Sequence, residues 1–221
     1  DIKQRMWPSL AVALPSLLVG LTVNICVALM MVLFRQSYLE FSIIVLCIII
    51  MSVSSLFYII GGQFIIGKLL LLVPISGYDT GINAYKFLIL PVLISVVSGI
   101  GAGARWYRTL FLEEIEQDYV RTARAKGLTE TQVLFKHVLK NAMIPILTGV
   151  VVILPLLFMG SLITESFFSI PGLGSYTIDA IKSQDFAIVR AMVFLGSVLY
   201  IIGLLLTDIS YALVDPRVRL S

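Results

Sequence analysis

Hydrophobic residues fill five long stretches of the chain, and polar and charged residues fill the segments between them. No Asp, Glu, Lys or Arg occurs within these stretches. A helix needs about 20 apolar residues to cross the hydrocarbon core of a bilayer. The pattern therefore predicts an all-α polytopic membrane protein with about five spans. The five uncharged stretches are Leu10–Phe34, Phe41–Gly67, Phe87–Ala104, Asn141–Thr164 and Ala191–Thr207.

Glycine marks two of these stretches. The apolar character of the second continues to Pro74, with Gly61, Gly62 and Gly67 inside it. The apolar segment from Phe41 to Pro74 is too long for one straight helix and too short for two spans. We therefore expect a span followed by a broken or partly re-entrant segment. In the third stretch Ser95, Gly99 and Gly103 recur every four residues. Such spacing predicts close helix contact, within this chain or at a subunit interface.

Composition narrows the class of protein. Hydrophobic residues make up 59% of the 221 residues, charged residues make up 13%, and the mean hydropathy is +1.02. A soluble domain is usually about 25% charged, so an ordinary cytosolic enzyme, a disulfide scaffold and a disordered chain are excluded. The net charge of +3 is too small to indicate a nucleic-acid partner. Cys26 and Cys47 lie inside apolar stretches, and we expect both to be small buried side chains.

Residues 105–142 form one long charged connection, which holds seven lysines and arginines. The positive-inside rule places this connection in the cytoplasm. Alternation then places residues 1–9, 74–86 and 166–187 outside. Because the chain would begin outside, with Asp1 in place of Met, we expect one further span upstream, which makes five spans here of a total of six.

Two short helices are predicted within this connection. The first, Glu113–Lys126, has acidic residues at its start and basic residues at its end, the order that the helix dipole favours. Gly127 follows, where a glycine commonly ends a helix. Thr129 and Gln132 form a capping-box pattern that begins the second helix, which runs to about Ala142. Apolar positions on both helices predict docking, either on a partner or on the chain's own spans.

The sequence gives little support for catalytic or ligand chemistry. The single histidine, His137, lies among lysines, and no cluster of His and Cys has metal-binding spacing. Residues 62–68 fit the pattern of a phosphate-binding loop. However, Leu69 follows where Ser or Thr is required, and the segment is apolar. We therefore predict no catalytic, cofactor or metal site on this chain.

The charged connection resembles a known signature. Asp118-Tyr-Val-Arg-Thr-Ala-Arg-Ala-Lys-Gly-Leu128, followed by His137-Val-Leu-Lys-Asn-Ala-Met-Ile-Pro145, is similar to the loop of permease subunits of the dipeptide/oligopeptide/nickel ABC transporters. The general EAA loop of ABC importers reads Arg121-Thr-Ala123 here, a departure that is usual in the peptide branch. Residues 104–108, 165–174 and 208–217 resemble the same family.

This resemblance implies the ABC importer permease fold, with residues 1–221 as a single transmembrane domain. The expected partners are a second permease subunit, two ATPase subunits, an extracytoplasmic substrate-binding protein and the lipid bilayer of a bacterial cytoplasmic (inner) membrane. The chain would not be an enzyme, because ATP and Mg²⁺ would be bound by the ATPase subunits. Peptides are the expected substrates, and nickel chelates or other small solutes are the alternative.

The resemblance also assigns roles to the connection between the two helices. Gly127 would allow the turn, and Ala123 would let the first helix approach a groove in the ATPase closely. The remaining residues would supply basic pairing groups or apolar anchors for the ATPase, and they are Arg121, Arg124, Lys126, Leu128 and Leu134.

A second candidate site follows the fourth stretch. Glu165 ends that stretch, and a buried acid near a membrane usually has a structural or functional reason. Glu165 would either accept backbone N–H groups of the following loop or face the transport pathway. The segment 166–187, with Pro171, Gly172 and Gly174, would be an outer gate or a contact for the binding protein.

An ion-coupled carrier or channel without an ATPase is the alternative from another class. Such carriers usually place ionisable residues in the middle of the membrane. The five uncharged stretches contain no Asp, Glu, Lys or Arg, and this favours the importer.

Overall fold

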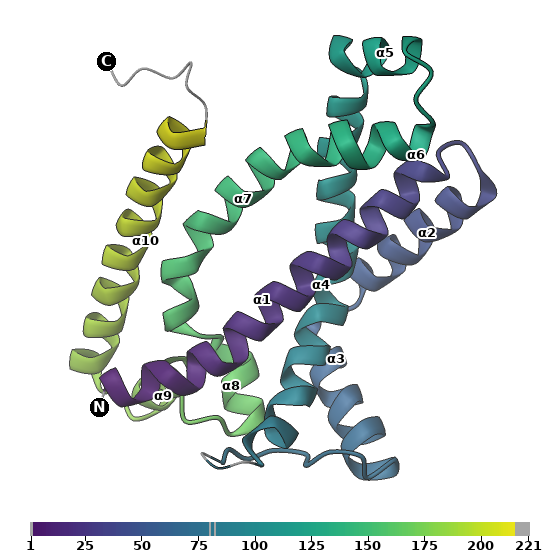
Figure 1. Ribbon diagram of the computed structural model, residues 1–221. Helices are drawn as coiled ribbons and strands as arrows, with labels where there is room; N and C mark the ends of the chain where they lie inside the picture. The colour runs from purple at the N-terminus through teal and green to yellow at the C-terminus, as the bar shows by residue number, and fades with distance from the viewer. Residues whose placement is uncertain (1, 80, 82, 215–221) are drawn as a thin grey trace.

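Four long helices run through the structure, and shorter segments join them (Figure 1). The structure is a computed structural model that describes residues 2–79, 81 and 83–214, with side chains as far as Ser210. The long helices are α1 (Ile2–Leu33), α4 (Ala84–Ile115), α7 (Leu139–Leu156) and α10 (Phe186–Val214). The shorter segments are α2 (Tyr38–Ser52), α3 (Ser55–Gly62), the π-helix η1 (Gln63–Leu69), α5 (Asp118–Ala125), α6 (Glu130–Val133), the π-helix η2 (Leu134–Val138), the 3₁₀-helix η3 (Leu157–Met159), α8 (Leu162–Phe168) and α9 (Leu173–Lys182). No strand occurs within the described residues.

The prediction of about five spans is confirmed by length and composition. Four helical stretches are long and apolar enough to cross a membrane, and α2 with α3 and η1 makes a fifth if this bent pair counts as one span. One of the four runs from Glu130 to Met159 and so includes α6, η2, α7 and η3. A sixth span upstream of residue 1 stays a prediction.

The second span is broken, as predicted, with a bend of 87°. The bend lies at Val53 and Ser54, which have extended backbone, and not at the glycines. The Tyr58 hydroxyl donates to the Ile50 carbonyl at 2.9 Å, which satisfies one acceptor at the end of α2. Gly62 allows α3 to pack closely on α4, because a Cβ on Gly62 would lie 2.5 Å from the Ile94 side chain of α4.

Small residues let α4 approach its neighbours closely. α1 lies against α4, and a Cβ on Gly103 would come within 2.3 Å of the Asn24 amide nitrogen on α1. A Cβ on Gly101 would come within 2.5 Å of the Cys47 carbonyl oxygen on α2. For Gly103 the predicted close contact therefore lies within this chain. Gly99 has no such neighbour within 4 Å.

The two cysteines differ in burial. Cys47 is 1% exposed, as expected for a small apolar side chain. Cys26 is exposed, so the prediction that both would be buried is wrong. An apolar stretch does not reveal which face of its helix the chain covers, and a membrane can accept the uncovered face.

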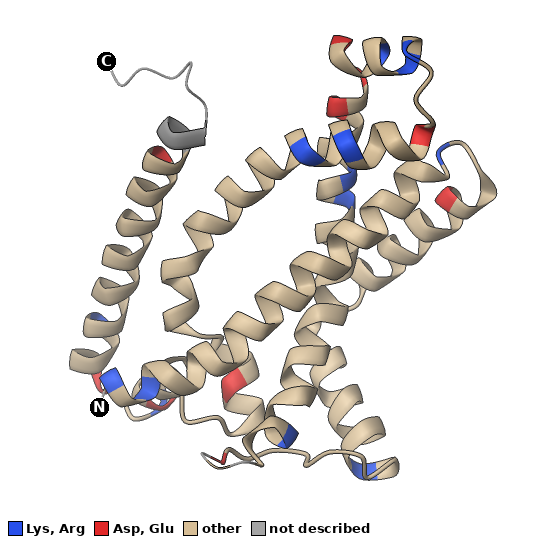
Figure 2. Ribbon diagram, viewed as in Figure 1, with Lys and Arg blue, Asp and Glu red and all other residues tan. Residues whose placement is uncertain are grey.

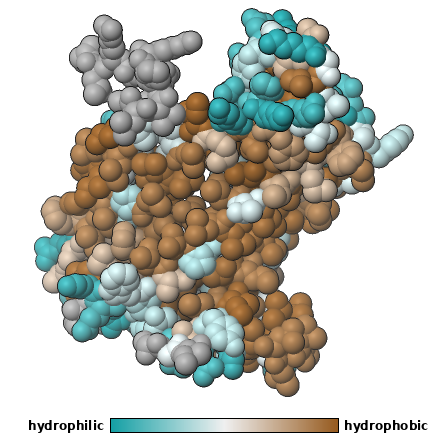
Figure 3. Space-filling model, in the orientation of Figure 1, coloured by the Kyte–Doolittle hydropathy of each residue, from teal (hydrophilic) through white to brown (hydrophobic). Residues whose placement is uncertain are grey.

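Charged residues occur mainly toward the two ends of the structure, and the space-filling view shows a largely apolar middle (Figures 2 and 3). We call the end with α5 and α6 the elbow end and the end with α8 and α9 the opposite end (Figure 1). Large apolar side chains on α10 are exposed, among them Val193, Phe194 and Ile201. This exposure suits contact with lipid, in which apolar groups need no covering protein.

Buried apolar side chains form two clusters. The elbow cluster comprises Ala28, Leu29, Met31, Val32, Cys47, Ala104, Phe111, Val120, Ala123, Val133, Leu134, Val138, Ala142 and Ile146. It joins the end of α1 to α2, α4, α5, α6, η2 and α7. The second cluster comprises Val12, Ile59, Leu90, Ile94, Phe168 and Ile170, and it joins α1, α3, α4 and α8.

Candidate functional site

The first candidate site is the elbow, formed by α5, Gly127 and α6. The predicted start of its first helix at Glu113 is wrong, because α4 continues to Ile115 and α5 begins at Asp118. Phe111 of α4 is fully buried in the elbow cluster, so packing holds this part of the chain in the long helix. Gln117 has extended backbone and separates the two helices. The chain between the two long helical stretches is thus shorter than the predicted 105–142.

Gly127 ends α5, as predicted. Its φ is +81°, a left-handed conformation that side-chain-bearing residues rarely adopt. The Gly127 N–H donates to the Arg124 carbonyl at 2.9 Å, and the Leu128 N–H donates to the Ala123 carbonyl at 3.4 Å. These bonds satisfy carbonyls at the helix end. A Cβ on Gly127 would have no neighbour within 4 Å, so the requirement for glycine comes from the backbone.

The predicted capping box at the start of α6 is also confirmed. The Thr129 hydroxyl accepts from the Gln132 N–H at 3.4 Å, and the Gln132 side-chain oxygen accepts from the Thr129 N–H at 3.2 Å. From Glu130 the helix continues without interruption into the long stretch that ends at Met159. The second half of the elbow is therefore the end of a candidate membrane span.

Two of the predicted contact residues of the elbow face inward. Ala123 and Leu134 are each 4% exposed and belong to the elbow cluster. Leu134 is therefore not an exposed anchor, which corrects the expectation for its side chain. Sequence spacing showed that these positions are apolar, but it could not show that they are buried in a cluster with residues of other helices of the same chain. Leu128 is half-buried, and Arg121 and Lys126 are exposed.

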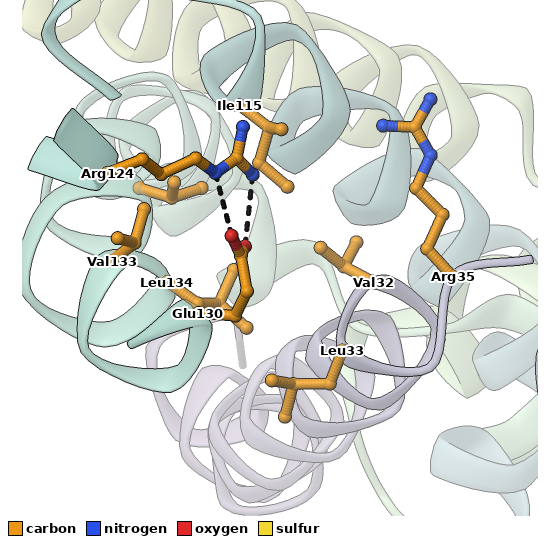
Figure 4. Close-up of a pocket in the computed structure, with 9 residues that line it drawn as sticks. Val32, Leu33, Arg35, Ile115, Arg124, Glu130, Val133 and Leu134 are labelled. Carbon is orange, nitrogen blue, oxygen red and sulfur yellow. Dashed lines mark hydrogen bonds and ion pairs between the residues drawn. The ribbon is translucent and has the colours of Figure 1, made fainter. Parts of the chain in front are cut away.

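Arg124 is paired within the chain. Its Nε and Nη2 atoms lie 2.8 and 3.0 Å from the two carboxylate oxygens of Glu130, so the ion pair is bidentate and joins α5 to α6 (Figure 4). The pair borders a hollow of about 150 Å³ beside Val32 and Leu33 of α1. The sequence predicts that Arg124 pairs with acidic groups of a partner, and in the structure it pairs with Glu130 of the same chain. Arg121 lies 3.3 Å from Asp118 on the same helix.

A second hollow lies on the elbow between α5 and η2, with a volume of about 450 Å³. The residues that line it include the apolar Ala123 and Leu128 and the polar Lys126 and His137. Tyr119 also lines it, and its hydroxyl donates to the Glu114 carboxylate. Burial and this hydrogen bond raise the pKa of Tyr119 to about 12, so the phenol stays protonated at neutral pH.

An ion pair that sequence reasoning missed links α2 to α4 near the elbow end. Arg108 Nε donates to Glu40 Oε1 at 3.1 Å, and the Gln36 N–H donates to Glu40 Oε2 at 2.6 Å. Glu40 is 7% exposed, so nearly all of its charge must be satisfied by these partners. The sequence shows only that Glu40 is a charged residue at the edge of an apolar stretch. This position does not identify Arg108, 68 residues away, as its partner.

The second candidate site surrounds Glu165 on α8, which is 1% exposed. Its Oε2 accepts from the Ser175 N–H at 3.1 Å. This bond is of the kind that the first predicted alternative requires, with an N–H group at the start of α9 as the donor. Whether Glu165 also faces the transport pathway stays a prediction. Burial raises the pKa of Glu165, and nearby donors, the Ser9 hydroxyl and loop N–H groups, offset only part of this effect.

Glycines make room for the Glu165 carboxyl group. A Cβ on Gly160 would lie 1.8 Å from Oε1, and a Cβ on Gly172 would lie 2.2 Å from Oε2. A Cβ on Gly174 would lie 2.7 Å from the Ser161 carbonyl oxygen. Gly172 and Gly174 are buried, and the role of the segment 166–187 as an outer gate or binding-protein contact stays a prediction. Pro171, in the same segment, is exposed.

Ser9 on α1 is a further residue of this site that the sequence did not indicate. It is 0% exposed, and its hydroxyl accepts from the Leu173 N–H at 2.8 Å. Ser9 and Glu165 also border a cavity of about 210 Å³ between α1, α7 and α8. Ser9 directly precedes the first uncharged stretch, and a serine at the edge of an apolar stretch is too common for its position to reveal such a role.

Residues 5–220 match the family described as "Binding-protein-dependent transport system inner membrane component". The oligopeptide transport system permease protein AppB of Bacillus subtilis (strain 168) is 40% identical over 132 residues, which cover 60% of this chain and 42% of AppB. A putative peptide transport system permease protein of Brucella abortus (strain 2308) is 34% identical over 223 residues, which cover 99% of this chain and 71% of the relative. A putative peptide permease protein of Brucella suis biovar 1 (strain 1330) is 30% identical over 226 residues, which cover 100% of this chain and 71% of the relative.

Proposed function

This chain belongs to the family of binding-protein-dependent transport system inner membrane components, and from this premise we propose that it is a permease subunit of an ATP-driven importer of peptides. The observation that carries the proposal is the elbow, because its second helix is continuous with a candidate span that ends at Met159. Peptide substrates are inferred from the relatives, which are described as oligopeptide or peptide permeases.

In the proposed mechanism the elbow lies on the cytoplasmic side and receives force from an ATPase subunit. ATP-driven closure of two ATPase subunits would displace the elbow and rock the attached helices, so that the pathway opens alternately to the two sides. The exposed Arg121 and Lys126 would contact the ATPase. The hollow lined by Ala123 and Leu128 would receive a side chain of that partner.

Contacts that hold the elbow together support its proposed role in receiving force from the ATPase. The bidentate pair of Arg124 and Glu130 fixes α5 against α6, and the capping box of Thr129 fixes the start of α6. The elbow cluster connects both helices to α1 and α4. A displacement of the elbow would therefore move the ends of several helices together, because packed side chains transmit strain.

The proposed complex contains this chain, a second permease subunit, two ATPase subunits and an extracytoplasmic binding protein in a bacterial inner membrane. Glu165 and the α8–α9 loop would then lie on the outer side. ATP and Mg²⁺ would be bound by the ATPase subunits, and the permease would hold half of the pathway.

Purification and reconstitution test this proposal. The chain, solubilised in detergent, should co-purify with two ATPase subunits. In vesicles, the complex with its binding protein should accumulate a labelled oligopeptide only when ATP is supplied on the elbow side. Peptide uptake that persists without ATPase subunits, driven by an ion gradient, would indicate an ion-coupled carrier and contradict the proposal.

A further inference from the structure

α1 contacts both candidate sites. Near its carboxyl end, Ala28, Met31 and Val32 are buried in the elbow cluster together with residues of α5 and η2. Near its amino end, Ser9 is buried against the α8–α9 loop. The helix is continuous over its 32 residues and lies against α4. At 1.5 Å per residue, its two ends are about 48 Å apart.

The start of α9 depends on side chains from other elements. The first N–H groups of a helix lack partners within the helix, and a side chain just before it usually accepts from them. Here the capping position is Gly172, which has no side chain. The Leu173 N–H donates instead to Ser9 of α1, and the Ser175 N–H donates to Glu165 of α8. Ser9 thus provides a hydrogen-bonded connection between α1 and the start of α9, beside the contact of the Arg5 guanidinium with the Tyr176 ring at 4.5 Å.

We propose that Ser9 is a positioning residue for transport, which holds α9 to α1 so that motion of α1 driven at the elbow displaces the α8–α9 loop. This inference rests on the proposed function, because it requires ATP-driven motion at the elbow. In the absence of the Ser9 hydroxyl, the Leu173 N–H would be buried without a partner. The outer loop would then no longer follow α1, although the elbow could still move.

Replacement of Ser9 tests the connection, and Ser16 provides a matched control. Ser16 lies on the same helix and lines the same cavity, but its hydroxyl donates only to the Val12 carbonyl of α1 itself, at 2.8 Å. The complex is reconstituted with its ATPase subunits and binding protein, and peptide uptake and ATP hydrolysis are measured together. Ser9→Ala should lower uptake per ATP by about tenfold, the change that corresponds to loss of one buried hydrogen bond. The rate of ATP hydrolysis by Ser9→Ala should stay within about twofold of the wild-type rate. Ser16→Ala should resemble the wild type in both uptake and hydrolysis.

The outcomes separate the two proposals. If the wild-type complex shows no ATP-dependent uptake, the proposed function fails. If the wild type transports and Ser9→Ala transports equally well per ATP, the inference about Ser9 is overturned and the proposed function stands.

A second measurement keeps Ser9 intact, in case the variant does not assemble. Spin labels are placed at the exposed Trp7 on α1 and the exposed Asp179 on α9, as Trp7→Cys and Asp179→Cys, with Cys26→Ser. The distance between the labels is measured in the wild-type complex without nucleotide and with ATP bound. We expect the distance between the labels to be the same in both states, because α1 and the start of α9 move as one body. A distance that changes on ATP binding would contradict the inference.

Discussion

At the scale of single residues, glycines at the two sites meet different requirements. Gly127 has a left-handed backbone and open space around it. Gly172 has an ordinary negative φ of −95°, but a Cβ there would collide with the Glu165 carboxylate. The first requirement can be predicted from sequence, because helix ends favour glycine. The second cannot, because the crowding side chain comes from another helix.

Gly127→Val should uncouple transport from ATP hydrolysis. A β-branched residue in the left-handed region costs about 1–2 kcal/mol, and the turn between α5 and α6 should distort. We expect a normal amount of assembled complex but a large loss of peptide uptake per ATP in reconstituted vesicles. Gly149→Val is the control, because Gly149 also has no neighbour within 4 Å but lacks a positive φ. Normal coupling in Gly127→Val would contradict the role of the elbow.

Glu165 should make the stability of the complex depend on pH. Because burial raises its pKa in the folded chain, its contribution to stability is fully present below the usual carboxyl pKa. That contribution is lost as the pH rises through the raised value. The thermal unfolding midpoint should therefore fall with rising pH in this window, and it should fall less in Glu165→Gln, which cannot ionise. Glu116→Gln, at an exposed site, should retain the wild-type slope.

At the scale of secondary structure, side-chain bonds between helices decide how the elements move together. The pair of Arg124 and Glu130 joins the two helices of the elbow, and the pair of Glu40 and Arg108 joins α2 to α4. The first pair is substantially exposed and the second is mostly buried. The two pairs should therefore contribute differently to stability and to coupling.

Exchange of the exposed pair tests its role as a connector. Arg124→Glu or Glu130→Arg alone should lower uptake per ATP, because like charges would push α5 and α6 apart. The double exchange should restore coupling. Unfolding stability should change by about 1 kcal/mol or less in each case, since exposed ion pairs contribute little. If the double exchange transports no better than the single variants, the connector role is wrong.

The buried pair should matter for stability. Arg108→Met leaves the Glu40 carboxylate buried without its charged partner, which should cost about 3–5 kcal/mol and lower the thermal unfolding midpoint sharply. The combination Glu40→Gln with Arg108→Met removes both charges and should recover much of the loss. Equal midpoints for the single variant and the wild type, measured in detergent, would show that the pair does not hold α2 against α4.

At the scale of the whole molecule, α1 connects regions that are far apart in the chain. It contacts the elbow through the elbow cluster and the α8–α9 loop through Ser9. Charged groups collect toward the two ends, and the apolar surface between them suits a bilayer (Figures 2 and 3). The same surface explains why Cys26 and much of α10 are exposed although their sequence is apolar.

The sequence by itself determined the features that depend on neighbouring residues. Five apolar stretches predict the spans, Gly127 predicts the end of α5, and the pattern from Thr129 to Gln132 predicts the capping box, because hydropathy and capping act over a few residues. Only the tertiary structure decided that Ala123 and Leu134 face inward and that Ser9 binds the start of α9. Ser9 and Leu173 are 164 residues apart, and only packing of the helices brings them within a hydrogen bond.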